Sequence, residues 1–197
     1  VKPGQRVAFV GATGAGKTTI FNLLTCVYKP TVGTFYLDGE EMKNLTPDKI
    51  NQKGIARTFQ NIRLFNNMTV VRNVMVGLHN CPEYKCSVVE SIFRLPRPSK
   101  MEKEMREKAK ELLRIFGLEE ERNNLACNLP YGKQRKLEIA RALATNPKIL
   151  LLDEPAAGMN PHETEDLANT IRFSRDNFDM TILLIEHDMR FVSELCD

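Results

Sequence analysis

The sequence has neither a long apolar run nor a long basic run. A transmembrane helix needs about 20 consecutive apolar residues, and no stretch of the 197 residues comes near that length. The net charge of +3 at pH 7 is not gathered in one segment, so charge does not suggest nucleic acid as a partner. Residues 1–4 are not followed by the apolar region of a signal peptide. We expect a globular chain that neither spans a membrane nor binds nucleic acid.

Cysteine is also scarce. The five cysteines are odd in number and scattered, and only Cys81 and Cys86 lie close together in the sequence. Nothing near that pair completes a metal site, so we expect reduced thiols, as in cytosolic proteins. The remaining composition is ordinary, and the length is sufficient for one sizeable core.

Glycine, in contrast, is concentrated near the start. The segment reads Gly11-Ala12-Thr13-Gly14-Ala15-Gly16-Lys17-Thr18-Thr19. It fits G-x-x-x-x-G-K-[ST], the P-loop that binds nucleotide phosphates. Glycine lets backbone N–H groups approach phosphate oxygens, and the N-terminus of the following helix favours the same negative charge. Lys17 is expected to reach the β- and γ-phosphates, and the Thr18 hydroxyl to bind Mg²⁺.

Apolar patterns on both sides of this loop predict an α/β fold with a parallel sheet. Buried strands are expected at 6–10, 55–59, 149–152 and 181–185. The last two are continuous apolar runs, which are typical of strands buried on both faces. Between the first two strands, the dipeptide Asp38-Gly39 predicts a small antiparallel hairpin.

Residues 61–128 differ in character. Thr69 is expected to cap an apolar helix, and a capping box at 99–102 to open a long amphipathic helix that ends at Gly117. The methionines of the long helix are best explained as core filling. We interpret residues 61–128 as an inserted helical subdomain, and residues 1–60 and 129–197 as a P-loop ATPase core.

Polar side chains follow each predicted strand. The P-loop follows the first strand, Gln60 the second, Asp153 and Glu154 the third, and His187 the fourth. Singly, such residues are more often structural or surface residues, but open α/β sheets bind ligands along this edge. Asp153 suits a Mg²⁺ ligand beside Thr18, and Gln60 can hydrogen-bond metal-bound water and the nucleophile. Glu154 is the candidate general base for the attacking water, and His187 can donate to the γ-phosphate.

Six elements in chain order resemble the ATP-binding subunit of ABC transporters. They are the P-loop, Gln60, Leu-Pro-Tyr-Gly-Lys-Gln at 129–134, the strand 149–154, Ala-Gly-Met-Asn at 157–160 and His187. Segment 129–134 resembles the family signature L-S-G-G-Q, 149–154 the Walker B strand, and 157–160 the D-loop S-A-L-D. Further stretches, among them Ile-Ala-Arg-Thr-Phe-Gln (55–60) and Leu-Glu-Ile-Ala-Arg-Ala-Leu (137–143), are similar to the ATPase subunit of bacterial importers for branched-chain amino acids.

The resemblance implies an ATPase that uses ATP and Mg²⁺ and works as a homo- or heterodimer. Each nucleotide would lie between one chain's P-loop and the partner's signature and D-loop residues: Pro130, Tyr131, Gly132, Lys133 and Asn160. Gly132 would present backbone N–H groups to the partner's γ-phosphate. Gln60 and the loop after it would contact a membrane permease. A solute-binding protein would deliver the solute to that permease. The subunit would then lie on the cytoplasmic face of the inner membrane.

Four positions depart from the family pattern. Pro130 and Tyr131 replace Ser and Gly of the signature, Lys133 replaces Gln, and Asn160 replaces Asp of the D-loop. Pro130 has neither a hydroxyl nor an N–H group, so one γ-phosphate contact is expected to be missing. Lys133 offers positive charge nearby as a substitute. At Ala12 and Thr13 the family usually has Pro and Asn, and these positions mainly set the shape of the loop.

We also expect the chain to be a fragment, because it lacks an initiator Met and stops within a predicted helix at 194–197. The aromatic residue that stacks on adenine in this family would precede residue 1. Its absence is expected to weaken nucleotide binding by ~1–2 kcal/mol, and missing C-terminal strands to lower stability.

Two other functions stay open. One is a soluble ABC-type ATPase without a permease, although the second cassette or long coiled-coil insertion of such proteins is not seen. The other is a nucleotide-binding module with weak turnover, which the departures at Pro130 and Asn160 favour. Glu154 and His187 argue against it, because degenerate sites usually lose the base first.

Overall fold

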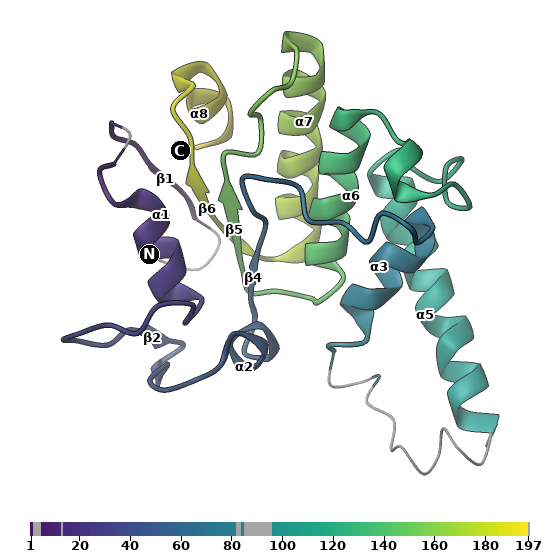
Figure 1. Ribbon diagram of the computed structural model, residues 1–197, viewed down its shortest axis with the longest axis horizontal. Helices are drawn as coiled ribbons and strands as arrows, with labels where there is room; N and C mark the ends of the chain where they lie inside the picture. Colours follow the sequence, from purple (N-terminus) through teal and green to yellow (C-terminus); the bar gives the residue numbers. More distant parts are fainter. Residues whose placement is uncertain (2–4, 13, 82–83, 85–95, 197) are drawn as a thin grey trace. The chain divides into compact units, whose positions relative to one another are not determined.

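The computed structural model describes residues 1, 5–12, 14–81, 84 and 96–196 (Figure 1). The chain forms two compact units, residues 1–60 with 147–197 and residues 61–146. In the second unit, α6 (Tyr131–Leu143) packs against α3 (Val70–Leu78) and α5 (Pro96–Ile115). The signature-like segment 129–134, which we expected at the end of the helical subdomain, lies in this unit. The expected bounds of the ATPase core (1–60 and 129–197) and of the helical subdomain (61–128) stay a prediction.

The first unit contains a four-stranded parallel sheet, as predicted. Its strands are β1 (Arg6–Phe9), β4 (Ile55–Arg57), β5 (Ile149–Asp153) and β6 (Thr181–Ile185), in the order β1-β6-β5-β4. Phe9 and Asp153 both lie opposite Ile185 in the register. The carboxyl ends of these strands, and the residues that follow them, therefore meet at one edge of the sheet.

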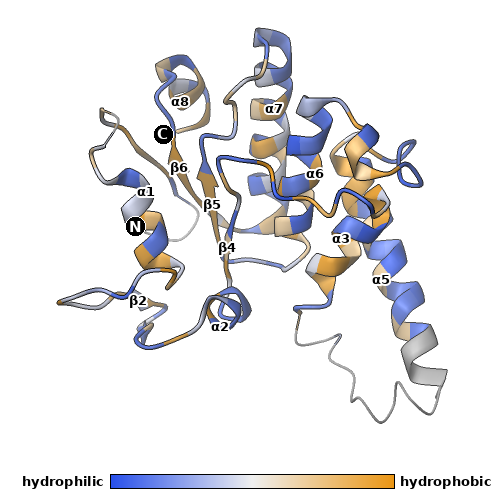
Figure 2. Ribbon diagram, in the orientation of Figure 1, coloured by the Kyte–Doolittle hydropathy of each residue, from blue (hydrophilic) through white to orange (hydrophobic). Residues whose placement is uncertain are grey.

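Both faces of this sheet are covered. Phe21 of α1 (Lys17–Leu24) packs against Leu151 and Leu183. Strands β5 and β6 are apolar in Figure 2, and nearly all of their residues are buried. On the opposite side from α1 lies α7 (Pro161–Phe178), which contacts α8 (Met189–Leu195). Because side chains alternate along a strand, the uninterrupted apolar runs of β5 and β6 serve both faces.

The small hairpin is also present, and a short helix follows it. Strands β2 (Tyr36–Leu37) and β3 (Glu40–Glu41) pair antiparallel around Asp38 and Gly39, both at positive φ, as a tight hairpin turn requires. Helix α2 (Pro47–Gln52) begins with proline in its first turn and is followed by Gly54, whose φ is +104°.

The second unit is helical. Thr69 caps α3 by accepting a hydrogen bond from the Arg72 N–H, as expected. Helix α5 begins at Pro96, three residues before the predicted cap at Ser99. Its first turn has no intrahelical partners for its N–H groups, so prolines at 96 and 98 do not interrupt it. A short 3₁₀ turn, η2 (Ala126–Asn128), leads towards α6.

No helix in the described part of the chain combines the length and apolar character needed to cross a membrane. The cysteines described there, Cys26, Cys81, Cys127 and Cys196, are free thiols.

Candidate functional site

The P-loop connects β1 to α1. Gly14 and Gly16 both have φ of +85°, a conformation that L side chains rarely adopt. The Lys17 ammonium folds over the loop and donates to the carbonyls of Gly11 at 2.7 Å and Ala12 at 3.0 Å. No acidic residue lies in the first turn of α1, so the positive helix end favours an anion. The predicted loop residue Thr13 lies outside the described residues.

Glu154 lies at the centre of the polar residues at the sheet edge. Its Oε2 accepts a hydrogen bond from Gln60 Nε2 at 2.8 Å, and its Oε1 lies 3.8 Å from His187 Nδ1. The side chain of His187 is 69% exposed, whereas that of Glu154 is 22% exposed. The structure thus brings together three side chains that the sequence placed after three different strands.

The backbone at Glu154 is unusual. Its φ is +47°, in the left-handed region, and its N–H donates to the Ile185 carbonyl at 2.9 Å. A non-glycine residue in this region costs on the order of 1–3 kcal/mol and is typical of functional sites. This turn directs the Glu154 side chain towards Gln60 instead of continuing strand β5.

Asp153, the last residue of β5, is buried against an arginine. Arg57 Nη2 donates to Asp153 Oδ2 at 2.7 Å, and the two side chains are only 6% and 4% exposed. Arg57 Nη1 also donates to Asn22 Oδ1 at 2.6 Å. We did not assign a role to Arg57 or Asn22 from the sequence. The signal was a single charged residue inside the predicted strand 55–59.

The donors at this edge fit Mg²⁺. Asp153, Thr18 and Gln60 offer carboxylate, hydroxyl and amide oxygens, the ligand types that this ion prefers. In residues 5–12, 14–81, 84 and 96–196 no group of three or more His, Cys, Asp or Glu side chains is placed to hold a metal.

Glu186 is a buried carboxyl group that we did not single out from the sequence. Its side chain is 2% exposed, and it accepts hydrogen bonds from the N–H groups of Ala156 at 3.1 Å and His187 at 3.2 Å. Burial raises the pKa of Glu186, and these backbone hydrogen bonds oppose that shift. Glu186 thereby ties the segment after β5 to the residue that carries the candidate imidazole.

The signature-like segment lies at the start of α6, in the second unit. Pro130 precedes the helix, Tyr131 is exposed in its first turn, and Gly132 is buried. The Lys133 ammonium forms an ion pair with Glu121 and lowers the pKa of that carboxyl by hydrogen bonding. The positive charge that we expected to substitute for a lost phosphate contact is therefore balanced within the chain.

Asn160 acts as a helix cap. Its Oδ1 accepts from the Glu163 N–H at 3.0 Å, and Glu163 Oε2 accepts from the Asn160 N–H at 3.1 Å. This reciprocal capping box opens α7. The side chain thus has a structural role in addition to its expected place in the D-loop.

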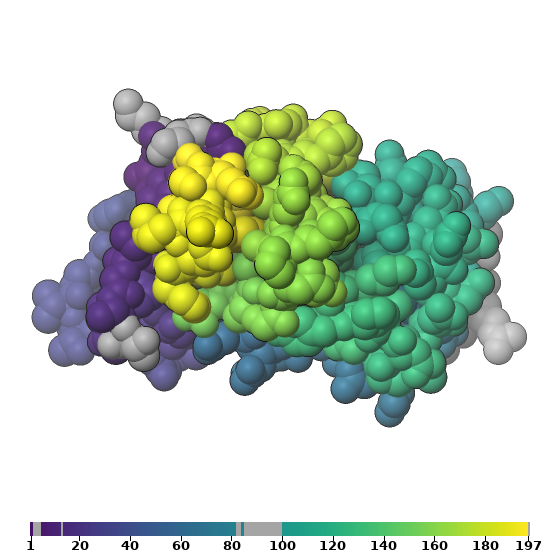
Figure 3. Space-filling view, turned by 90° about the horizontal axis from the view of Figure 1, so that it is seen from above, coloured from purple at the N-terminus to yellow at the C-terminus, as the bar shows by residue number. Residues whose placement is uncertain are grey.

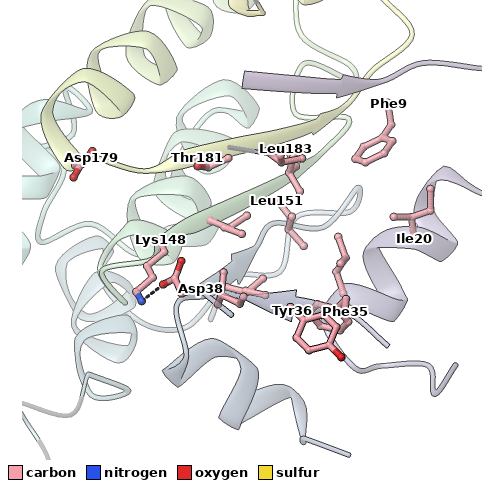
Figure 4. A pocket seen from close by; sticks show the side chains of 15 residues that line it. Phe9, Ile20, Phe35, Tyr36, Asp38, Lys148, Leu151, Asp179, Thr181 and Leu183 are labelled. Atoms are coloured by element: carbon pink, nitrogen blue, oxygen red, sulfur yellow. Dashed lines mark hydrogen bonds and ion pairs between the residues drawn. The ribbon is translucent and has the colours of Figure 1, made fainter. Parts of the chain in front are cut away.

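A separate cavity of about 580 Å³ lies in the first unit (Figure 4). Its lining is largely apolar and includes Phe9, Phe35, Leu151 and Leu183, with the ion pair of Lys148 and Asp38 among the labelled side chains. None of Lys17, Asp153, Glu154 and His187 lines it. The catalytic candidates therefore do not belong to this cavity.

The sequence pattern of the ABC transporter family matches residues 1–157. The chain belongs to this family. It is 47% identical over its whole length to the high-affinity branched-chain amino acid transport ATP-binding protein BraF of Pseudomonas aeruginosa, of which it covers 76%. It is 44% identical over 195 residues to LivG of Escherichia coli K12, a protein of the same description, and again covers 76%.

Solved structures agree with this assignment. A nucleotide-free ATP-binding cassette of an ABC transporter matches with a TM-score of 0.83 and 33% identity, over 100% of this chain and 76% of that one. An ABC cassette in its ADP conformation matches with the same TM-score and coverage at 34% identity. The fold and the family that we expected are confirmed, and the chain is an ABC ATPase.

Proposed function

We propose that this ABC ATPase powers an importer for branched-chain amino acids. The support is its 47% and 44% identity to ATP-binding proteins described as acting in that transport. The arrangement of Gln60, Glu154 and His187 around one point of the sheet edge carries the catalytic part of the proposal.

The P-loop and its lysine would bind the phosphates of ATP. Backbone N–H groups of residues 11–19 and the start of α1 favour the negative charge, and Lys17 would exchange its bonds to the Gly11 and Ala12 carbonyls for phosphate oxygens. Thr18 and Asp153 would hold Mg²⁺, with Gln60 on its water. The ion, when bound, neutralises phosphate charge.

Glu154 would accept the proton of the attacking water. Its carboxylate is already oriented by the Gln60 amide, and the turn at positive φ holds it beyond the strand end. His187, which is largely exposed, would donate a hydrogen bond to the γ-phosphate as negative charge develops. Glu186 would position His187 by accepting its backbone N–H.

Two chains would complete each nucleotide site head to tail. The exposed Tyr131 and the buried Gly132 at the start of α6 would face the partner's γ-phosphate, with Pro130, Lys133 and Asn160 beside them. One matching structure, 27% identical with a TM-score of 0.80, covers 98% of this chain and 79% of that one. It is described as the dimeric post-hydrolysis state of an ATP-binding cassette bound to ADP and phosphate.

The permease would contact Gln60 and the loop after it, at the cytoplasmic face of the membrane. Closure of the dimer would then move this loop, and a solute-binding protein would deliver the amino acid from the other side. We expect the ATPase activity of the subunit to rise when it is combined with the co-purified permease and a leucine-loaded binding protein. Stimulation only by an unrelated solute would overturn the assignment of substrate.

Replacement of Glu154 by Gln tests the catalytic proposal. Gln preserves a hydrogen-bond acceptor for Gln60 but removes the base, so we expect ATP turnover to fall by about 10²–10⁴-fold while ATP binding persists. Phosphate release and binding of a fluorescent ATP analogue are the measurements. Glu165→Gln, an exposed change on α7, is the matched control and should keep wild-type turnover. Unchanged turnover in Glu154→Gln would show that another group is the base.

A further inference from the structure

Arg57 lies between the elements that carry the proposed magnesium ligands. It is the last residue of β4, and its guanidinium bonds to Asp153 of β5 and to Asn22 of α1. The ring centres of Phe21 and Phe59 lie 5.6 and 5.1 Å from its central carbon. The charge is thus buried and held by two polar and two aromatic partners.

The bond to Asn22 relates Arg57 to the P-loop helix. Asn22 follows Thr18 by four residues, and residues at this spacing share one face of a helix. The guanidinium therefore bridges the Asp153 carboxylate to the face of α1 that begins with Thr18. Two of the expected protein ligands of Mg²⁺ are thus related to Arg57, Asp153 by a direct hydrogen bond and Thr18 through Asn22 on the same helix face.

The pair also sets the charge of the site. A carboxylate that is 4% exposed attracts a cation strongly, because interior charges are poorly screened. The positive charge of Arg57, at 2.7 Å from the carboxylate, opposes that attraction. A free divalent cation therefore meets little net negative charge at this site. A cation bound to a nucleotide triphosphate is accompanied by the negative charge of the phosphates.

We infer that Arg57 is a positioning residue for the magnesium site. It holds Asp153 against α1 and balances its charge, so that this edge binds Mg²⁺ as the nucleotide complex and not as the free ion. The inference rests on the proposed role of Asp153 as a magnesium ligand. A purely structural ion pair would affect stability but not this selectivity.

The test uses Mn²⁺ alone as a paramagnetic probe, titrated into the full chain and followed by electron paramagnetic resonance without nucleotide. Arg57→Gln removes the charge but keeps a donor for Asp153, and we expect it to bind Mn²⁺ at least about tenfold more tightly than wild type. Arg57→Lys keeps the charge and should bind Mn²⁺ as weakly as wild type. In the double variant Arg57→Gln/Asp153→Asn, the added affinity should disappear.

Other results decide against the inference. Equal Mn²⁺ affinity in wild type and in folded Arg57→Gln would overturn it, as would added affinity that survives Asp153→Asn. Wild type alone also tests it, even if Arg57→Gln fails to fold. Nucleotide-free Mn²⁺ binding to wild type that is tight and lost in Asp153→Asn would contradict the charge balance.

Binding of a fluorescent ATP analogue with and without Mg²⁺ separates this inference from the proposed function. If Mg²⁺ does not strengthen nucleotide binding in wild type, or if Asp153→Asn leaves that effect intact, the assignment of Asp153 fails. A different case is that Mg²⁺ strengthens nucleotide binding in wild type and Asp153→Asn removes this effect. If Arg57→Gln then leaves nucleotide-free Mn²⁺ binding unchanged, only the inference about Arg57 fails.

Discussion

At the scale of single residues, the catalytic edge contains carboxyl groups in three different environments. Asp153 is buried and paired with Arg57, Glu154 is partly exposed beside Gln60 and His187, and Glu186 is buried among backbone N–H groups. The chemistry of each follows from its surroundings. Only Glu154 combines access to solvent with a neighbouring amide, which suits a group that must receive a proton.

Glu186 should make stability depend on pH. Burial raises its pKa in the folded state, so the folded chain holds this proton more tightly than the unfolded chain. The resulting stability is fully present below the ordinary glutamate pKa of about 4.3 and is lost as pH rises towards the folded pKa. The variant Glu186→Gln has no carboxyl group at this position, so it does not undergo this loss of stability. We therefore expect urea unfolding to show a smaller decrease in stability from pH 4.5 to pH 7 in the variant than in wild type.

The exposed change Glu165→Gln is the matched control for that experiment and should follow wild type at both values of pH. If Glu186→Gln and wild type lose equal stability over this interval, the raised pKa of Glu186 is refuted.

At the scale of elements, α3 and α6 touch at Gly77. A Cβ atom there would lie 2.3 Å from the Arg141 carbonyl oxygen and 2.9 Å from the Ala144 Cβ. Gly77→Ala should therefore destabilise the helical unit, since overpacking costs about 1–3 kcal/mol and outweighs the gain in helix propensity. Thermal unfolding followed by circular dichroism measures the loss. Arg72→Ala, an exposed change on the same helix, should leave stability within about 0.5 kcal/mol.

Helix α6 contains a buried ion pair, and the carboxylate of this pair is hydrogen-bonded to the segment that follows Gln60. Arg135 Nη1 donates to Glu138 Oε2 at 2.8 Å, with exposures of 0% and 2%, and Glu138 Oε1 accepts from the Arg63 N–H at 3.1 Å. Arg135 also donates to the Tyr131 hydroxyl at 3.4 Å. The exposed start of α6 is thus connected, through two buried charges, to the loop that we propose to contact the permease.

Glu138→Ala removes the carboxylate that compensates the buried Arg135 charge. We expect the free energy of unfolding to fall by about 3–5 kcal/mol, measured by urea denaturation. The double variant Arg135→Met/Glu138→Leu replaces both charges by apolar groups and should recover most of the loss. A double variant as unstable as Glu138→Ala would show that the charges themselves are needed.

At the scale of the whole molecule, each catalytic site is completed by a second chain in the proposed mechanism. Gly132→Asp places a carboxylate where the partner's γ-phosphate would bind. In the Glu154→Gln background, we expect this change to abolish ATP-dependent dimers in size-exclusion chromatography. Asn123→Asp adds the same charge at an exposed position of the same unit and should leave dimers intact. Dimers that persist in folded Gly132→Asp would contradict the signature assignment.

The arrangement of the chain also shows where prediction from sequence succeeds. The P-loop, the strands and the small hairpin were predicted because each depends on local signals, such as glycine spacing, apolar runs and the Asp38-Gly39 turn. The packing of α6 against α3 and α5 was not predicted, because it is a contact between segments far apart in the sequence. Helix α5 begins at Pro96, before the capping box that we predicted at 99–102.

The sequence by itself determined which residues follow the strands, and hence that Gln60, Asp153, Glu154 and His187 would share one edge of a parallel sheet. It did not determine which helices pack together, such as α8 (yellow) beside α7 (yellow-green) in Figure 3. Only the tertiary structure decided the partners of the residues at this edge. Arg57 and Asp153 are 96 residues apart, and they meet because β4 and β5 are neighbours in the order β1-β6-β5-β4. Local backbone preferences specify strands and turns, whereas strand order depends on how all apolar faces are buried at once.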